Sequence, residues 1–137
     1  MKRRTLRYLV PVAALLAAAG CDYKESFPYQ GDELIDFTTD SLYFSFGKEP
    51  FSVTEKMMEV GVEIVGSPVS HDRGYRIRID PLRTTAQAGQ HYDALEETRT
   101  IPAGASSTTI PVRVHRLELE DETVYTLRLE LVETEDF

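Results

Sequence analysis

Three short stretches between residues 84 and 116 decide the fold: TTAQAGQHY over Thr84–Tyr92, TIPAG over Thr100–Gly104, and TTIPVRVHR over Thr108–Arg116. Glycine and proline favour turns, whereas the β-branched residues around them favour strands. The pattern therefore predicts a turn, a strand, a tight Pro/Gly turn and a long strand, which together form one corner of a β-sandwich. The corner predicts structure and suggests no chemistry.

Outside this corner, apolar and polar residues alternate with a period of two, which is typical of strands with one buried face. Further strands are expected at Leu34–Phe37, Leu42–Phe46, Met58–Ile64, Tyr75–Ile79 and Val124–Val132. Pro111 has no N–H group, so the long strand that contains it should lie at a sheet edge or bulge there. Beyond residue 20 the sequence shows no sustained helical pattern, although Leu117–Glu122 has room for one helical turn. Residues 33–137 are therefore expected to form an all-β, immunoglobulin-like antiparallel sandwich of about seven strands.

The amino terminus carries the pattern of a lipoprotein signal peptide, predicted over residues 1–20. Four basic residues precede an apolar run, and Ala18-Ala19-Gly20 then places small residues directly before Cys21, the only cysteine. This arrangement is typical of cleavage between Gly20 and Cys21, followed by attachment of lipid to the Cys21 thiol, and is too short for a membrane-spanning helix. Residues 21–32 are expected to be a lipidated tether to the membrane, because several acyl chains hold a protein there almost permanently.

Charge and size narrow the range of partners. Removal of residues 1–20 leaves 117 residues, enough for one domain, and changes the formal net charge from −8 to −12 because four positive charges are lost. An acidic surface argues against nucleic acid and against docking on anionic headgroups. The sequence thus favours a solvated domain in the cell envelope, anchored by lipid, with the face of the membrane left open.

The corner also resembles the Calx-beta-like pattern. The resemblance rests on Thr85-Ala86-x-x-Gly89-x-His91-Tyr92, followed by Ile101-Pro102-Ala103-Gly104. It is extended by Asp40-Ser41-Leu42-x-Phe44-Ser45-Phe46 and by Arg116-x-x-x-Leu119. Together these motifs resemble a family of Bacteroidota-type lipoproteins described only as a domain of unknown function.

The resemblance implies a lipid-anchored, non-catalytic protein of the outer membrane, from a family associated with glycan uptake of the starch-utilisation type. It also implies a second β-rich half after Phe137, so the chain is expected to be a short paralogue or a truncated reading frame. True Calx-beta domains bind calcium through clustered acidic residues. Here His91 replaces the more usual Asp, and Glu118–Glu122 lacks the ligand spacing of a calcium loop, so calcium binding is not carried over.

The candidate residues of the corner are given structural roles. Gly89 and Gly104 are expected to adopt positive φ in turns. His91 and Pro102 belong to these turns, and Tyr92 is expected to pack its ring under the corner while its hydroxyl group bonds to the backbone. The histidines His71, His91 and His115 have no partners at metal-ligand spacing, so no metal or cofactor is predicted.

Two functions remain open. The first is a cell-envelope binding or adhesion module that presents loops to a glycan or to a protein. The second is a structural accessory or scaffold subunit of an outer-membrane glycan-uptake complex, with no ligand of its own. Catalysis is not expected, because the sequence has no nucleophile elbow and no other catalytic constellation. The aromatic residues of the tether, Tyr23, Phe27 and Tyr29, are expected to contact a partner or to pack on the edge of the domain.

Overall fold

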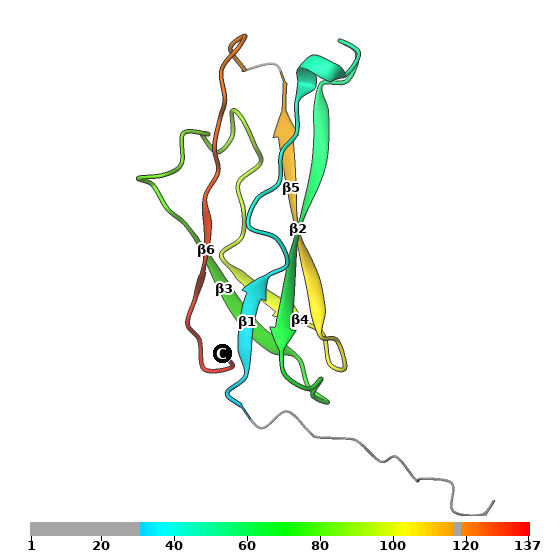
Figure 1. Cartoon of the computed structure of the whole chain (residues 1–137), viewed down its shortest axis with the longest axis vertical. Coiled ribbons are helices and arrows are strands. Elements are labelled where there is room, and N and C mark those ends of the chain that lie inside the picture. The colour runs from blue at the N-terminus through cyan, green and yellow to red at the C-terminus, as the bar shows by residue number, and fades with distance from the viewer. Residues whose placement is uncertain (1–30, 117–118) are drawn as a thin grey trace, which may run out of the picture.

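The computed structural model describes residues 31–116 and 119–137, and these residues form six strands and one short 3₁₀ helix (Figure 1). The strands are β1 (Leu34–Phe37), β2 (Glu55–Val65), β3 (Arg73–Ile79), β4 (Thr98–Ile101), β5 (Ser107–His115) and β6 (Leu129–Val132), and the helix is η1 (Phe46–Lys48). They build two antiparallel sheets with strand orders β1-β2-β5 and β4-β3-β6. The predicted signal peptide, its cleavage at Gly20, lipidation of Cys21 and nearly all of the tether lie outside the described residues.

The two sheets share one hydrophobic core. Its buried side chains come from both sheets and from Tyr92 in the corner: Val62, Ile64, Tyr75, Ile77, Tyr92, Ile101, Ile110 and Val112. Within β2 and β5 the buried residues alternate with exposed ones, as the period-two pattern requires. The fold is therefore all-β and sandwich-like, with the inner faces of the two sheets packed against each other.

Most of the predicted strands are confirmed. Those expected at Leu34–Phe37, Met58–Ile64 and Tyr75–Ile79 lie within β1, β2 and β3, and the two strands of the corner are β4 and β5. Pro111 lies opposite Glu59 in β5, which is an edge strand of its sheet, as the missing N–H group predicts.

The strand predicted at Leu42–Phe46 is wrong. The chain leaves the sheet after Thr38, whose N–H group donates to the carbonyl oxygen of Gly61, and Phe46 then begins η1. Phe44 and Phe46 pack edge to face, with ring centroids 4.9 Å apart, while Leu42 and Tyr43 are exposed. The alternation therefore reflects packing of two rings and not pairing with a neighbouring strand.

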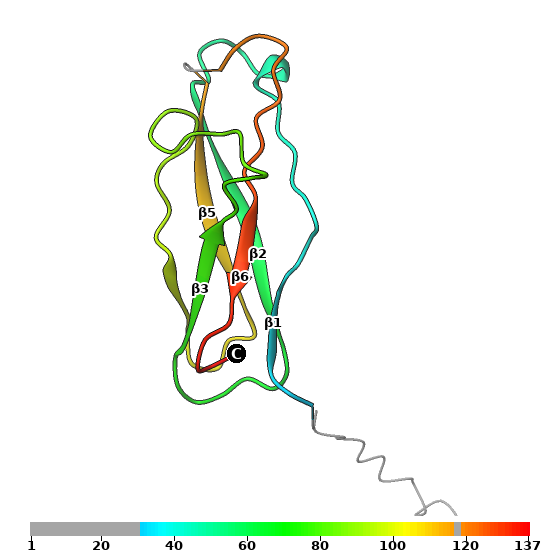
Figure 2. The ribbon, with the colours of Figure 1, turned by 90° about the vertical axis from the view of Figure 1, so that its left-hand side faces the viewer.

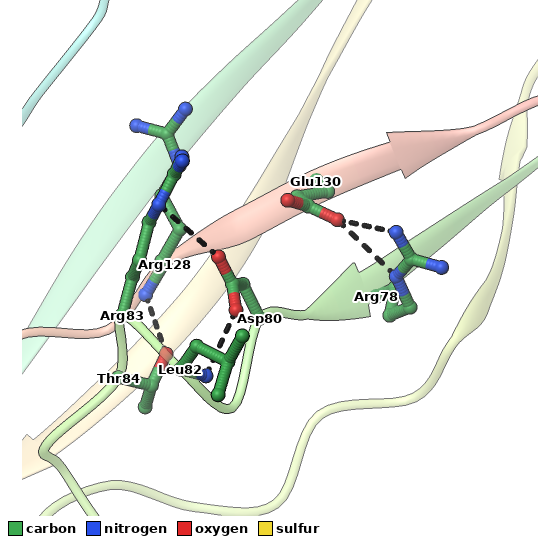
Figure 3. A network of polar contacts seen from close by, with 7 residues as sticks. All are labelled: Arg78, Asp80, Leu82, Arg83, Thr84, Arg128 and Glu130. Carbon is green, nitrogen blue, oxygen red and sulfur yellow. Dashed lines mark hydrogen bonds and ion pairs between the residues drawn. The ribbon is translucent and has the colours of Figure 1, made fainter.

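The strand predicted at Val124–Val132 is only half formed. Residues 126 and 128 still accept backbone hydrogen bonds from the chain after β3, but threonine hydroxyl groups replace backbone carbonyls as the acceptors for their N–H groups, as Figure 3 shows for Thr84. The hydroxyl group of Thr84 accepts a hydrogen bond from the N–H of Arg128, and that of Thr85 accepts one from Thr126. Pro81 ends β3 just before these threonines, so regular pairing begins only at Leu129.

The described chain begins and ends at the same end of the molecule. The start of β1 and Phe137 lie there, whereas η1 and residues 119–124 lie at the opposite end, which we call the distal end (Figures 1 and 2). At the first end the buried guanidinium of Arg73 in β3 bonds to the Glu33 carboxylate at 2.6 Å and lies 5.1 Å from the ring centroid of Phe137. This ion pair connects the residue before β1 to the other sheet.

The described residues contain no helix with the length and apolar character needed to span a bilayer.

Candidate functional site

The two glycines of the corner adopt the conformation predicted for them. Gly89 has φ 81° and Gly104 has φ 76°, both in the left-handed region that glycine occupies without strain. The turn after β4 is closed by a hydrogen bond from the N–H of Ala105 to the carbonyl oxygen of Pro102. The N–H of Gly104 donates to the carbonyl oxygen of Val69, so this turn is also attached to the loop between β2 and β3.

His91 is a structural residue of the corner. Its Nδ1 atom accepts a hydrogen bond of 2.9 Å from the backbone N–H of Gln87, which closes the turn around Gly89. Its ring lies against the ring of Tyr125, with centroids 4.1 Å apart, and the side chain is buried. The Nδ1 atom of His91 is therefore occupied by a hydrogen bond within the turn.

Tyr92 packs into the core as predicted, and burial raises the pKa of its hydroxyl group. Within residues 31–116 and 119–137 that hydroxyl group has no hydrogen bond to the backbone, so the expected hydroxyl contact stays a prediction. The backbone of Tyr92 instead secures the corner, because its carbonyl oxygen accepts the N–H of Gly89 and the residue bridges to Val114 of β5.

The three histidines lie in different surroundings. His71 is exposed, His91 is buried, and His115 bonds through Nε2 to the Asp93 carboxylate at 2.8 Å. Glu55 and Arg113 complete a surface group of opposite charges around His115. No set of three or more His, Cys, Asp or Glu residues in the described ranges has a geometry that could hold a metal ion.

A small hollow of about 160 Å³ lies beside β3 and is lined by Ile77, Arg78, Ile79, Leu95 and Glu97. Pockets that enclose small molecules usually measure about 300–1,000 Å³. A ligand of this protein is therefore better sought on an exposed surface than in this hollow.

The distal end carries a loop of defined shape, residues 46–54, which we call the distal loop. It is held by one side chain: the guanidinium of Arg116 donates hydrogen bonds to the carbonyl oxygens of Phe46, Glu49, Pro50 and Val53. The guanidinium also lies 5.6 Å from the ring centroid of Phe46 and 4.8 Å from that of Phe51. Because Arg116 directly follows β5, the loop is fixed to the sheet.

Phe51 is the most exposed aromatic residue of the distal loop, with 91% of its surface accessible. Its ring is positioned by Arg116 and yet presented to solvent. The sequence pattern predicts no role for Phe51, and it places Arg116 only at the end of the predicted long strand and in the family resemblance. The available signal was Gly47–Pro50, which predicts a loop but cannot show which cation orders it.

Leu119 to Glu122, the described part of the predicted helical turn, form no helix. The N–H of Leu119 donates to the carbonyl oxygen of Arg116, and Glu122 has φ 59°, which is outside the right-handed helical region. Val124 follows and is largely exposed. This segment also lies at the distal end (Figure 1).

These features define an all-β protein made of two antiparallel sheets, with an ordered loop at one end. Residues 22–137 match the family model described as "Domain of unknown function (DUF4843)", and the chain belongs to this family. The resemblance to a domain of unknown function is thereby confirmed. Neither a curated protein nor a solved structure matches the chain significantly.

Proposed function

We propose that this chain is a lipid-anchored, non-catalytic binding module of the cell envelope, which contacts a glycan through its distal loop. In this proposal the domain is immunoglobulin-like, and the corner at residues 84–116 is the part that resembles Calx-beta domains. Cys21 carries the lipid, and residues 21–32 connect it to the end at which β1 starts. The outer membrane and a role in carbohydrate uptake belong to this proposal and rest on the family resemblance.

The strand order supports the immunoglobulin-like part of the proposal. Immunoglobulin sandwiches have one sheet in which strands A, B and E are neighbours and another built around strands C and F. The order β1-β2-β5 corresponds to A-B-E, and β4-β3-β6 corresponds to C′-C-F. On this assignment, Tyr92 lies in the connection between strands C and C′, so the corner differs from the tyrosine corner of antibody domains.

The observation that carries the binding proposal is the exposed ring of Phe51 on a loop that Arg116 has already ordered. Aromatic rings contribute a large contact area at low entropic cost, and sugar rings stack on them through their C–H groups. A loop that is rigid before binding loses little freedom on binding, which favours affinity. The loop also lies at the opposite end of the domain from the start of β1 (Figure 2).

Affinity electrophoresis in gels that contain plant or host polysaccharides tests the glycan part. We expect retarded migration on at least one polysaccharide, and we expect Phe51→Ala to abolish the retardation. Leu82→Ala is the matched control, because Leu82 is 94% exposed but lies in a different loop, after β3. Retardation that both variants retain would show that the distal loop is not the contact surface.

Membrane fractionation tests the anchor. We expect Cys21→Ala to release the protein from membranes and to remove the fatty acyl adduct from the mass spectrum of the amino-terminal fragment. Cys21→Ser serves as a second variant, because it preserves the size of the side chain but not the thiol that the lipid modifies. Unchanged retention of both variants in the membrane fraction contradicts lipid anchoring.

The second candidate function is a scaffold subunit of a glycan-uptake complex with no ligand of its own. It is favoured over the first if no polysaccharide retards the protein and the wild-type chain co-purifies with outer-membrane uptake proteins. Phe51→Ala then tests whether the distal loop is the contact to those proteins.

A further inference from the structure

Among the described residues, strand β6 is paired along one edge, and its other edge is open. Its partner is β3, and the described residues provide no strand on its other side. Backbone groups of successive residues in a strand point alternately to the two edges. The carbonyl oxygens of Thr126 and Arg128 accept hydrogen bonds from Thr85 and Asp80 on the β3 side, so the even-numbered residues face that side.

The odd-numbered residues Leu127, Leu129 and Leu131 therefore turn their N–H and C=O groups to the open edge. None of these groups has a hydrogen-bond partner among the described residues. The three leucine side chains are half-buried and pack against the core from the margin of the sheet. An exposed strand edge of this kind is a template for pairing with another strand.

The outward face of the same edge carries two opposite charges, two residues apart. Glu130 bonds to Arg78 of β3 at 2.6 Å (Figure 3), and 30% of its side chain remains accessible. Arg128 is exposed, and its guanidinium makes no hydrogen bond or ion pair within the described ranges. In an antiparallel pair, directly opposite residues lie on the same face, so a strand with this order of charges can be complementary to itself.

We propose that the open edge of β6 pairs with β6 of a second copy of this chain, antiparallel, about a two-fold axis at Leu129. In this register Leu129 faces its own symmetry mate, and Leu127 faces Leu131 of the second copy. All three are positions whose N–H and C=O groups point to the open edge, as hydrogen-bonded pairs require. Arg128 then lies opposite Glu130 of the second copy, and the two-fold axis produces the same pair a second time.

This pairing joins the two β4-β3-β6 sheets into one continuous sheet and covers the half-buried leucines at its centre. A two-fold axis perpendicular to the strands also inverts one copy relative to the other. The two ends at which residue 31 lies would therefore point in opposite directions (Figure 1). The contact is separate from the distal loop and does not rest on glycan binding or on the lipid.

The proposal is tested on residues 22–137, which contain every described strand and no cysteine. Sedimentation equilibrium is expected to show a reversible monomer–dimer equilibrium. Arg128→Glu and Glu130→Arg each place like charges in both cross-strand pairs, so each alone should weaken association by about tenfold. An equimolar mixture of the two variants restores both opposite-charge pairs and should associate like the wild type. Arg76→Glu, on the neighbouring strand, is the control and should have no effect.

Cross-linking tests the register independently. Opposite residues in a non-hydrogen-bonded pair have Cα atoms about 4.5 Å apart, which a disulfide can span. We expect the double variant Arg128→Cys/Glu130→Cys to form a covalent dimer on oxidation. Arg128→Cys alone should not, because residue 128 lies diagonally to its own symmetry mate at about 7–8 Å.

Three results would overturn the proposal. The first is a monomer at millimolar concentration. The second is a dimer that neither charge variant weakens and that the double cysteine variant does not trap. The third is concentration-independent protection of the Leu127, Leu129 and Leu131 amides from hydrogen exchange, because another segment of the same chain would then cover the edge. Circular dichroism of each variant shows whether the change has affected folding instead.

Discussion

The ring of His91 lies against the ring of Tyr125, with centroids 4.1 Å apart, while its Nδ1 atom accepts the backbone N–H of Gln87. One side chain thus closes the turn of the corner and attaches it to the segment that leads into β6. We expect His91→Ala to reduce the free energy of unfolding by about 1–3 kcal/mol, because the part-buried N–H group of Gln87 loses its acceptor and the buried ring loses its contact with Tyr125. Urea denaturation measures this change.

His91→Asn is the informative companion, since its amide oxygen can accept the same hydrogen bond but cannot replace the ring. We expect an intermediate loss of stability. His71→Ala, at an exposed histidine, should leave the urea midpoint unchanged. Equal midpoints for His91→Ala and the wild type would show that the turn does not depend on this acceptor.

Gly104 has φ 76°, and an added Cβ atom would meet no other atom within 4 Å. Any cost of substitution therefore comes from the backbone conformation and not from a clash. We expect Gly104→Val to reduce stability by about 1–3 kcal/mol, because a β-branched residue is strained at positive φ. Ala103→Val, at the exposed position before it, is the control for the added side chain, and a loss of equal size there would contradict the explanation.

Arg116 holds the distal loop through four carbonyl oxygens, which a lysine cannot reach with the same planar set of donors. We expect Arg116→Lys to preserve the charge but to accelerate amide hydrogen exchange at residues 46–54. Exchange within β3 should stay unchanged. Arg113→Lys, on the exposed face of β5, is the matched control, and similar exchange profiles for the two variants would show that the loop does not need the guanidinium.

The two core tyrosines make the free energy of unfolding depend on pH in the alkaline range. Burial raises the pKa of Tyr75 above its ordinary value of 10.0, an effect that Arg99 partly offsets, and burial also raises the pKa of Tyr92. Above pH 10 the unfolded chain loses these protons while the folded chain keeps them. The free energy of unfolding should therefore be unaffected below pH 10 and fall as the pH rises through the folded pKa values.

Urea midpoints at pH 8 and at pH 11 measure this fall. Tyr75→Phe should make it shallower, because phenylalanine has no proton to lose. Tyr43→Phe is the control, since Tyr43 is exposed and should not contribute. A fall of the same size in Tyr75→Phe and in the wild type would show that ionisation of Tyr75 does not cause the loss of stability.

Period-two alternation predicted β1, β2, β3 and β5, because each of these strands has one face on a shared core. The same alternation was misleading at Leu42–Phe46, where Phe44 and Phe46 pack on each other and on nearby cations. The alternation also overestimated the length of the last strand, but for a different reason. The hydroxyl groups of Thr84 and Thr85 accept the backbone N–H groups of Arg128 and Thr126. A period-two pattern of apolar residues does not show that a side chain will replace a backbone acceptor in this way.

The candidate site was less predictable than the fold. The positive φ of Gly89 and Gly104 follows from local turn chemistry, so the sequence was sufficient there. The distal loop depends on contacts between Arg116 and residues 63 to 70 positions earlier in the chain, and no local pattern encodes such a distance. The open edge of β6 likewise appears only once strand order and register are known.

The ion pair between Glu33 and Arg73 has a mechanical consequence. A pulling force applied at residue 31 first reaches Glu33, one residue before β1, and Arg73 passes part of that force directly to β3 in the opposite sheet. The load is thus divided between both layers and does not peel β1 away from β2 alone. Resistance to stretching along the long axis should accordingly depend on this single buried arginine.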